Sequence, residues 1–184
     1  AFFNGAQPDT VEGAIALAEA LERSGQGQAA QDLVRNWWRT QSFEEANQSR
    51  IYGRWGAWLT TDDHVTRLNM LLLGPHGPAT RAMVAMVPAD RQQVANVVMN
   101  LRTAYAPDAI VAALSPDQAY DPAVVLERVR LLRSSSRQSE AFPLLRALPP
   151  APSHREGQNT LWSERRNYFL DALQQRNPQA AYDA

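Results

Sequence analysis

The sequence predicts an all-α protein, built as an irregular α-superhelix, or solenoid, of stacked helical hairpins. Alanine, leucine, arginine and glutamine are abundant whereas isoleucine occurs only at positions 15, 51 and 110, a composition that favours helix over strand. Apolar residues recur at helical spacing between turn signals. The same helix–turn–helix pattern also returns along the chain, which is typical of stacked repeats. We expect roughly two-thirds helix and almost no sheet.

The clearest helix lies within the stretch 59–73. Thr60 or Thr61 can cap its N-terminus, and Thr60 has capping-box spacing to Asp63. The acidic residues that follow fall in the first turn, where the helix dipole favours negative charge. Apolar side chains then continue at three- and four-residue spacing until a Gly/Pro-rich segment, 74–78, ends the helix.

The other helices follow from the same spacing and from their turn residues. Asp121 followed by Pro122 predicts an N-cap with proline at the first helical position. Residues 115–120 are expected to be irregular or a brief turn, and the proline-rich stretch predicts a softer joint at 149–158. In chain order, the helices are expected at about 8–23, 28–39, 43–58, 60–73, 79–87, 88–105, 108–114, 122–133, 138–148 and 159–175, with another opening at Pro178.

The helix pairs align with one another. The windows 15–38, 65–88 and 126–149 match without gaps, and a fourth copy starts near residue 166. Each pair leaves an apolar face that a neighbour must cover, which predicts a stacked superhelix. The coinciding apolar residues are Ile15, Val65 and Leu126; Ala18, Leu68 and Val129; Leu21, Leu71 and Leu132; Leu33, Met83 and Leu144; and Val34, Val84 and Leu145.

The fourth copy is incomplete, because its second helix reaches the last residue after about two turns. Such a short helix is a poor cap for a solenoid. We therefore expect residues 1–184 to form a single superhelical domain that is a fragment of a longer protein.

Charge and composition exclude several classes of function. Eighteen basic and 19 acidic residues give a net charge of −1, so nothing points to nucleic acid or an anionic membrane surface. No apolar run is long enough to span a membrane. The chain has no cysteine, which excludes disulfides and thiolate chemistry. Every basic residue is arginine. This choice fits selective pairing with carboxylates or phosphates through the planar guanidinium. Because the arginines are spread over the whole chain rather than clustered, codon bias in a GC-rich genome explains it as well.

Two sets of residues carry a resemblance to a known family. Residues 59–68 read Leu-Thr-Thr-Asp-Asp-His-Val-Thr-Arg-Leu, after Trp-Trp-Arg at 37–39, Phe43 and Tyr-Gly at 52–53. Residues 162–166 read Trp-Ser-Glu-Arg-Arg, with Ala-Tyr at 181–182. Over about residues 15–184, the chain resembles the helical N-terminal region of soluble lytic murein transglycosylases, in which a Leu-Thr-x-x-Asp-His-x-x-Arg-Leu string marks a helix of the superhelix.

The resemblance implies a periplasmic parent enzyme that cleaves the MurNAc–GlcNAc bond of peptidoglycan and leaves a 1,6-anhydro end. In that family the helical region is a curved scaffold, and a Glu-Ser pair in a separate C-terminal lysozyme-like domain performs catalysis. This chain contains neither a Glu-Ser dipeptide nor the family's Gly-Leu-Met-Gln stretch. No catalytic residue is therefore carried over, and the resemblance implies a scaffold that meets peptidoglycan through its parent protein.

Aromatic residues are the most attractive binding candidates, because sugar rings stack on aromatic faces. Trp37, Trp38, Tyr52, Trp55 and Trp58 lie within 22 residues of one another. Tryptophan at helical spacing more often packs between helices. We name Trp38 and Trp58 as the candidate glycan contacts and expect at most one of them to be exposed.

The charged candidates have simpler structural interpretations. His64 beside two aspartates suggests a metal or acid–base site, but capping and an Asp63–Arg67 pair within a network between helices explain these residues. Glu44 and Glu45 suit the first turn of a helix better than a glycosidase carboxylate pair. Glu164 is the other carboxylate considered for such a pair. The arginines at 128, 130, 133, 165 and 166 are expected on solvated faces. We therefore expect no catalytic residue, cofactor or metal.

Two other functions compete with the scaffold. A tetratricopeptide-like module that binds a protein or peptide fits helix pairs equally well, since fold does not fix function. A regular 34-residue period would favour that module, and the windows do not have one. A free-standing helical enzyme has little support because no nucleophile–base or metal constellation appears.

Overall fold

The computed structural model describes residues 8–103, 107–149 and 154–184. Within these ranges the protein is all-α: 77% of the residues are helical and none is in a strand. Of the expected joint at 149–158, residues 150–153 lie outside the described residues and 155–158 form the first turn of α11. The elements are α1 (Val11–Arg23), α2 (Gly27–Thr40), α3 (Glu45–Trp55), η1 (Gly56–Trp58), α4 (Thr61–Leu72), α5 (Pro78–Val84), α6 (Ala89–Leu101), α7 (Pro107–Val111), α8 (Pro116–Ala119), α9 (Pro122–Ser134), α10 (Gln138–Ala141), η2 (Phe142–Ala147), α11 (Arg155–Gln174) and α12 (Pro178–Asp183).

Several helix boundaries differ from the sequence prediction. The expected helix 138–148 changes after one turn into the 3₁₀ segment η2, because Pro143 has no backbone N–H and its ring disfavours a continuous α-helix. Residues 115–120, expected to be irregular or a brief turn, contain the short helix α8. Ser115 and Gln118 form a reciprocal capping box at its N-terminus. α11 starts at Arg155 rather than near 159.

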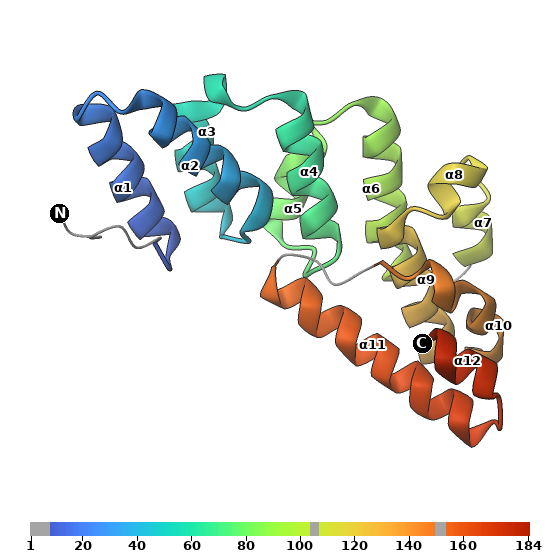
Figure 1. Ribbon diagram of the computed structural model, residues 1–184. Coiled ribbons are helices and arrows are strands. Elements are labelled where there is room, and N and C mark those ends of the chain that lie inside the picture. Colours follow the sequence, from blue (N-terminus) through green and yellow to red (C-terminus); the bar gives the residue numbers. More distant parts are fainter. Residues whose placement is uncertain (1–7, 104–106, 150–153) are drawn as a thin grey trace.

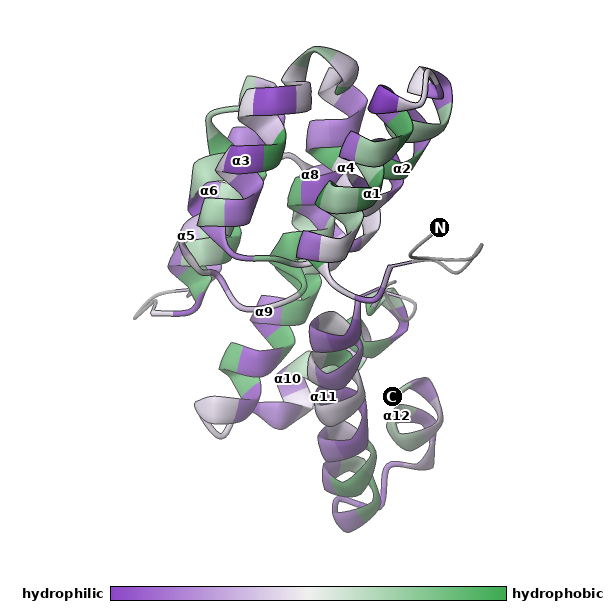
Figure 2. Ribbon diagram, turned by 90° about the vertical axis from the view of Figure 1, so that its left-hand side faces the viewer, coloured by the Kyte–Doolittle hydropathy of each residue, from purple (hydrophilic) through white to green (hydrophobic). Residues whose placement is uncertain are grey.

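The helices are arranged in sequence order over most of the molecule. Figure 1 shows α1, α2, α4 and α6 following one another from left to right, with α3 behind α2 and α5 behind α4. α7 to α10 lie beyond α6, and the long α11 runs obliquely beneath them. α4 contacts both α2 and α6, and α9 contacts both α6 and α11. Figure 2 shows apolar and polar bands along the helices, as expected for amphipathic helices that share a core.

Buried apolar residues form two clusters. The first is built from α1 to α7 and the start of α9, and the second from the rest of α9, η2, α11 and α12. α9 contributes to both, since Val124 belongs to the first cluster and Val125 to the second. Among the described helices, none has the length and hydropathy of a membrane-spanning segment.

Three of the four aligned hairpins share one turn geometry. Gly25, Ser136 and Arg176, which the sequence alignment makes equivalent, have φ angles of 77°, 58° and 55°. In each case the next residue donates its N–H to the carbonyl five residues earlier, at 2.8–2.9 Å, which is the bond of a Schellman C-cap. The remaining hairpin has Pro75 at this position, and proline cannot adopt a positive φ. The sequence repeat is therefore also a backbone repeat.

Candidate functional site

The Leu59–Leu68 motif begins with a capping box, as the sequence predicts. The Thr60 side chain accepts a hydrogen bond from the Asp63 N–H, and the Asp63 carboxylate accepts one from the Thr60 N–H at 2.8 Å. The side chain of Asp63 is fully buried, and Arg35 and Arg39 of α2 both bind its carboxylate, at 3.0 and 3.2 Å. Burial alone would raise the pKa of Asp63, but the Thr60 N–H and Arg35 outweigh it, so the pKa is lowered. Asp63 therefore stays ionised and fastens α4 to α2.

Arg67 lies entirely inside the protein. Its guanidinium donates to the Gln48 Oε1 at 2.9 Å and to the carbonyl oxygens of Trp38 and Gln41 at 2.9 and 3.0 Å. Its central carbon lies 4.0 Å from the Phe43 ring centroid and 4.6 Å from that of Trp38, a cation–π geometry. Burial lowers the pKa of Arg67 to about 9, so the group still carries its charge at neutral pH.

The expected Asp63–Arg67 pair is wrong, although the expected network between helices is confirmed. Asp63 takes its arginines from α2, while Arg67 reaches neutral acceptors on α3 and at the end of α2. Helical spacing places the two residues on adjacent turns, but each has a better partner across a helix interface. The motif thus binds α2, α3 and α4 together.

The two candidate glycan contacts lie in different surroundings. Trp38 has no exposed surface, and its ring packs against Phe43, Tyr52, His64 and the guanidinium of Arg67. It therefore has no ring face open to a sugar. Trp58 is half-buried at the end of η1, with its ring stacked on that of Trp55 at a centroid distance of 6.1 Å.

Carboxylates gather at one open cleft of about 640 Å³ between the start of α3, the α4–α5 turn and the start of α11. Glu44, Glu45 and Glu156 line it, and all three are exposed. Glu45 lies in the first turn of α3, as predicted, and Glu44 is its N-cap residue. A glycosidase acid needs dry surroundings that raise its pKa, which exposed carboxylates do not have. Within the part of the chain that the structure describes, no cluster of three potential ligands could hold a metal ion.

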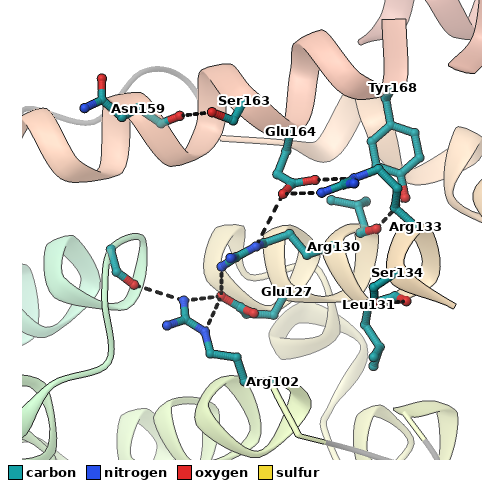
Figure 3. Close-up of polar contacts among 12 residues, drawn as sticks. Arg102, Glu127, Arg130, Leu131, Arg133, Ser134, Asn159, Ser163, Glu164 and Tyr168 are labelled. Atoms are coloured by element: carbon teal, nitrogen blue, oxygen red, sulfur yellow. Dashed lines mark hydrogen bonds and ion pairs between the residues drawn. The ribbon is translucent and has the colours of Figure 1, made fainter. Parts of the chain in front are cut away.

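An arginine–glutamate ladder crosses from α6 through α9 to α11 (Figure 3). Arg102 binds the Glu127 carboxylate at 2.6 Å, and Arg130 bridges Glu127 at 3.0 Å and Glu164 at 3.5 Å. Arg133 closes the ladder with two hydrogen bonds to Glu164, at 2.9 and 3.0 Å. Both glutamates are buried. Bonding to Glu164 raises the pKa of Arg133.

The ladder was missed by sequence reasoning, although one local signal existed. Glu127 and Arg130 are three residues apart on a helix, a spacing that allows a pair. Arg102 lies 25 residues before Glu127, and Glu164 lies 34 residues after Arg130, and no periodicity connects them. Beside the ladder, the Tyr168 hydroxyl donates to the Val129 carbonyl, and burial raises the pKa of Tyr168.

Of the aromatic candidates named from the sequence, Tyr52 is 44% exposed, but the exposed aromatic side chains of α11 were missed. Trp162 is 67% exposed and Phe169 is 44% exposed, and Leu170 and Leu173 beside them are 41% and 50% exposed. All four belong to α11. Residue spacing shows that a helix has apolar residues on two faces. It does not show which of the two faces packs against a neighbouring helix and which is exposed to solvent.

Comparisons with known proteins identify no relative: no family model, no curated protein and no solved structure matches this chain.

Proposed function

We propose that this chain is the non-catalytic helical scaffold domain of a periplasmic lytic transglycosylase that acts on peptidoglycan. The observation that carries the proposal is the set of contacts that the polar side chains of the Leu59–Leu68 motif make. Three of the four polar positions shared with the family string, Thr60, Asp63 and Arg67, bind other helices or cap α4. The fourth, His64, packs its ring against Trp38 of α2 and Tyr52 of α3. These are the tasks that such a motif has in a scaffold.

A stacked superhelix is part of the same proposal. The shared turn at Gly25, Ser136 and Arg176 supports equivalent hairpins. The placement of α4 between α2 and α6, and of α9 between α6 and α11, supports neighbours that cover each other's faces. Ala18, Leu68 and Val129, aligned in the sequence repeat, each have no exposed surface.

The state of the buried acids supports a role without catalysis in this part of the parent protein. A general acid for glycoside cleavage is a carboxyl group whose pKa is raised toward neutrality. Asp63 has a lowered pKa, and Glu127 and Glu164 are each held by two arginines. These carboxylates are committed to ion pairs between helices.

Digestion of purified sacculi tests the proposal. The isolated chain should release no anhydro-muropeptides, while an active lytic transglycosylase run in parallel releases them. The gene that encodes the chain should also encode a lysozyme-like domain with a Glu-Ser pair. Anhydro-muropeptide release by the chain, or a gene without such a domain, would contradict the proposal.

A tetratricopeptide-like interaction module is the second candidate, and the exposed apolar side chains of α11 favour it. The windows of the sequence repeat start 50, 61 and about 40 residues apart, whereas that family has a 34-residue period. Capture of one specific partner from peptidoglycan-free extract, with no association with sacculi, would favour the module over the scaffold.

A further inference from the structure

α11 has two apolar faces, and only one of them is covered. Leu161, Tyr168 and Ala172 are buried in the second core cluster, against α9 and its neighbours. In Figure 1, α11 forms the lower edge of the molecule, with α9, α10 and α12 all on its upper side. The uncovered face carries a stripe at helical spacing, which we call the α11 stripe: Trp162, Arg166, Phe169, Leu170 and Leu173.

The sequence repeat indicates that this face is built to be covered. Phe169 aligns with Ala18, Leu68 and Val129. Those three residues are 0% exposed, whereas Phe169 is 44% exposed. α4 contacts α2 and α6, and α9 contacts α6 and α11, so each has a helix on both flanks. The principal contacts of α11 are with α9 and α12.

The charges beside the stripe define the chemistry of its occupant. Trp162, Phe169 and Leu170 line a groove of about 460 Å³ together with Arg165 and Arg166. Arg165 donates to the backbone oxygens of Leu148, Pro149 and Ala184, and Arg166 is exposed. An apolar groove with a cationic rim is complementary to an apolar helix with carboxylates along its edge.

We propose that the α11 stripe binds an amphipathic α-helix of a partner protein, with leucine-type residues on the stripe and carboxylates facing Arg165 and Arg166. The stripe covers 12 residues, from Trp162 to Leu173, which corresponds to about 18 Å of helix. A partner helix of three or four turns therefore fills it. The inference rests on the exposed face of α11 and on the sequence repeat, and it does not depend on the proposed role in peptidoglycan cleavage.

Titration calorimetry with two synthetic helical peptides tests the proposal. Each peptide has about 18 residues with leucine at the a and d positions of a heptad, and one carries glutamate at the flanking positions where the other carries lysine. We expect the glutamate peptide to bind about tenfold or more tightly than the lysine peptide. Arg166→Glu should weaken the glutamate peptide and strengthen the lysine peptide.

Substitutions on and off the stripe identify the surface. Phe169→Glu should weaken the glutamate peptide at least about tenfold. Tyr120→Ala removes another aromatic ring, 62% exposed and next to α8, and should leave binding unchanged. Because all these side chains are exposed, the variants should keep the thermal midpoint of the parent chain. Equal binding of both peptides, or binding that Phe169→Glu leaves intact, overturns the proposal.

Two further experiments on the same protein variants detect other possible occupants of the α11 stripe. If a second copy covers the stripe, sedimentation will show a dimer that Phe169→Glu dissociates, and the proposal is wrong. If the stripe binds lipid, vesicles of phosphatidylglycerol will capture the chain through Trp162 while the glutamate peptide fails to bind, and the proposal is again wrong. A monomer that vesicles do not capture, and that binds the glutamate peptide, supports it.

Discussion

At the scale of the residue, charge is placed where only the three-dimensional structure can satisfy it. Arg67 is fully buried, yet its hydrogen bonds go to a side-chain amide and to two backbone carbonyls. Two aromatic rings flank the same guanidinium. One side chain therefore satisfies acceptors on two elements and packs against both.

Arg67→Ala should be among the most destabilising substitutions in the chain. It leaves three acceptors without their donor and creates a cavity beside Trp38 and Phe43, so we expect a loss of about 3–5 kcal/mol in the free energy of unfolding. Arg23→Ala removes an arginine that is 71% exposed and paired with Glu19 at 3.9 Å, and should change stability by less than about 0.5 kcal/mol. Urea unfolding followed by circular dichroism measures both. Similar losses in the two variants would contradict the interpretation of Arg67.

The three histidines, His64, His76 and His154, should make the protein sensitive to mild acid. Burial lowers the pKa of each one, and it is the largest influence in every case. Below the ordinary histidine pKa of about 6.5, the unfolded chain then binds more protons than the folded chain. Stability should therefore be full above that pH and fall as the pH drops toward the lowered values.

Thermal unfolding at pH 7.5 and pH 5.5 checks this dependence. A loss of about 1 kcal/mol lowers the midpoint of a domain of this size by about 2–4 °C. Neither ring nitrogen of His154 has a hydrogen-bond partner among the described residues. His154→Leu should therefore be tolerated at pH 7.5 and should reduce the difference between the thermal midpoints at the two pH values. A pH-independent midpoint would show that the buried histidines do not titrate as inferred.

At the scale of the element, backbone geometry repeats more faithfully than residue type. The turns after α1, α9 and α11 share a left-handed residue, but only the first one is glycine. The sequence could predict that α4 and α9 are helices and which residues cap them, because both features depend on neighbours within four residues. The left-handed conformation of Ser136 and Arg176 could not, since nothing local about serine or arginine favours it.

Ser136→Gly and Arg176→Gly should each stabilise the protein. A residue with a side chain is strained in the left-handed region by about 1 kcal/mol relative to glycine, and the Schellman bonds remain available to glycine. Gly25→Ala makes the opposite change at the equivalent position and should destabilise by about 1 kcal/mol. Denaturant midpoints of the three variants test the repeat directly. If Ser136→Gly lowered the stability, the serine side chain would have to stabilise the left-handed backbone conformation at this position.

At the scale of the whole molecule, the two core clusters meet at α9 and at the ion ladder. The order of helices could be anticipated from the aligned windows, but the contact between α6 and α9 joins separate helices, and the Arg102–Glu127 pair over it joins residues 25 positions apart. The burial of Trp38 and the exposure of Trp162 have the same origin. Helical spacing shows which residues share a face, and the neighbour that covers this face is set by tertiary packing.

Glu164→Gln should loosen α11 from the rest of the protein. Glu164 is 5% exposed and accepts from Arg133 and Arg130, so the substitution leaves both guanidiniums without their shared carboxylate. We expect a loss of about 1–3 kcal/mol, because the two guanidiniums are about one-third exposed and Arg130 keeps Glu127 as a partner. Because Arg130 also binds Glu127, Glu127→Gln and Glu164→Gln should combine non-additively.

Hydrogen exchange locates the effect of Glu164→Gln within the molecule. Amides of α11 and α12 should exchange faster, while those of α1 to α4, which belong to the first core cluster, should keep their protection. Glu156→Gln changes an exposed glutamate on the same helix and should leave the exchange pattern as it is. Uniform acceleration along the chain would mean that the two clusters unfold together and that the ladder does not separate them.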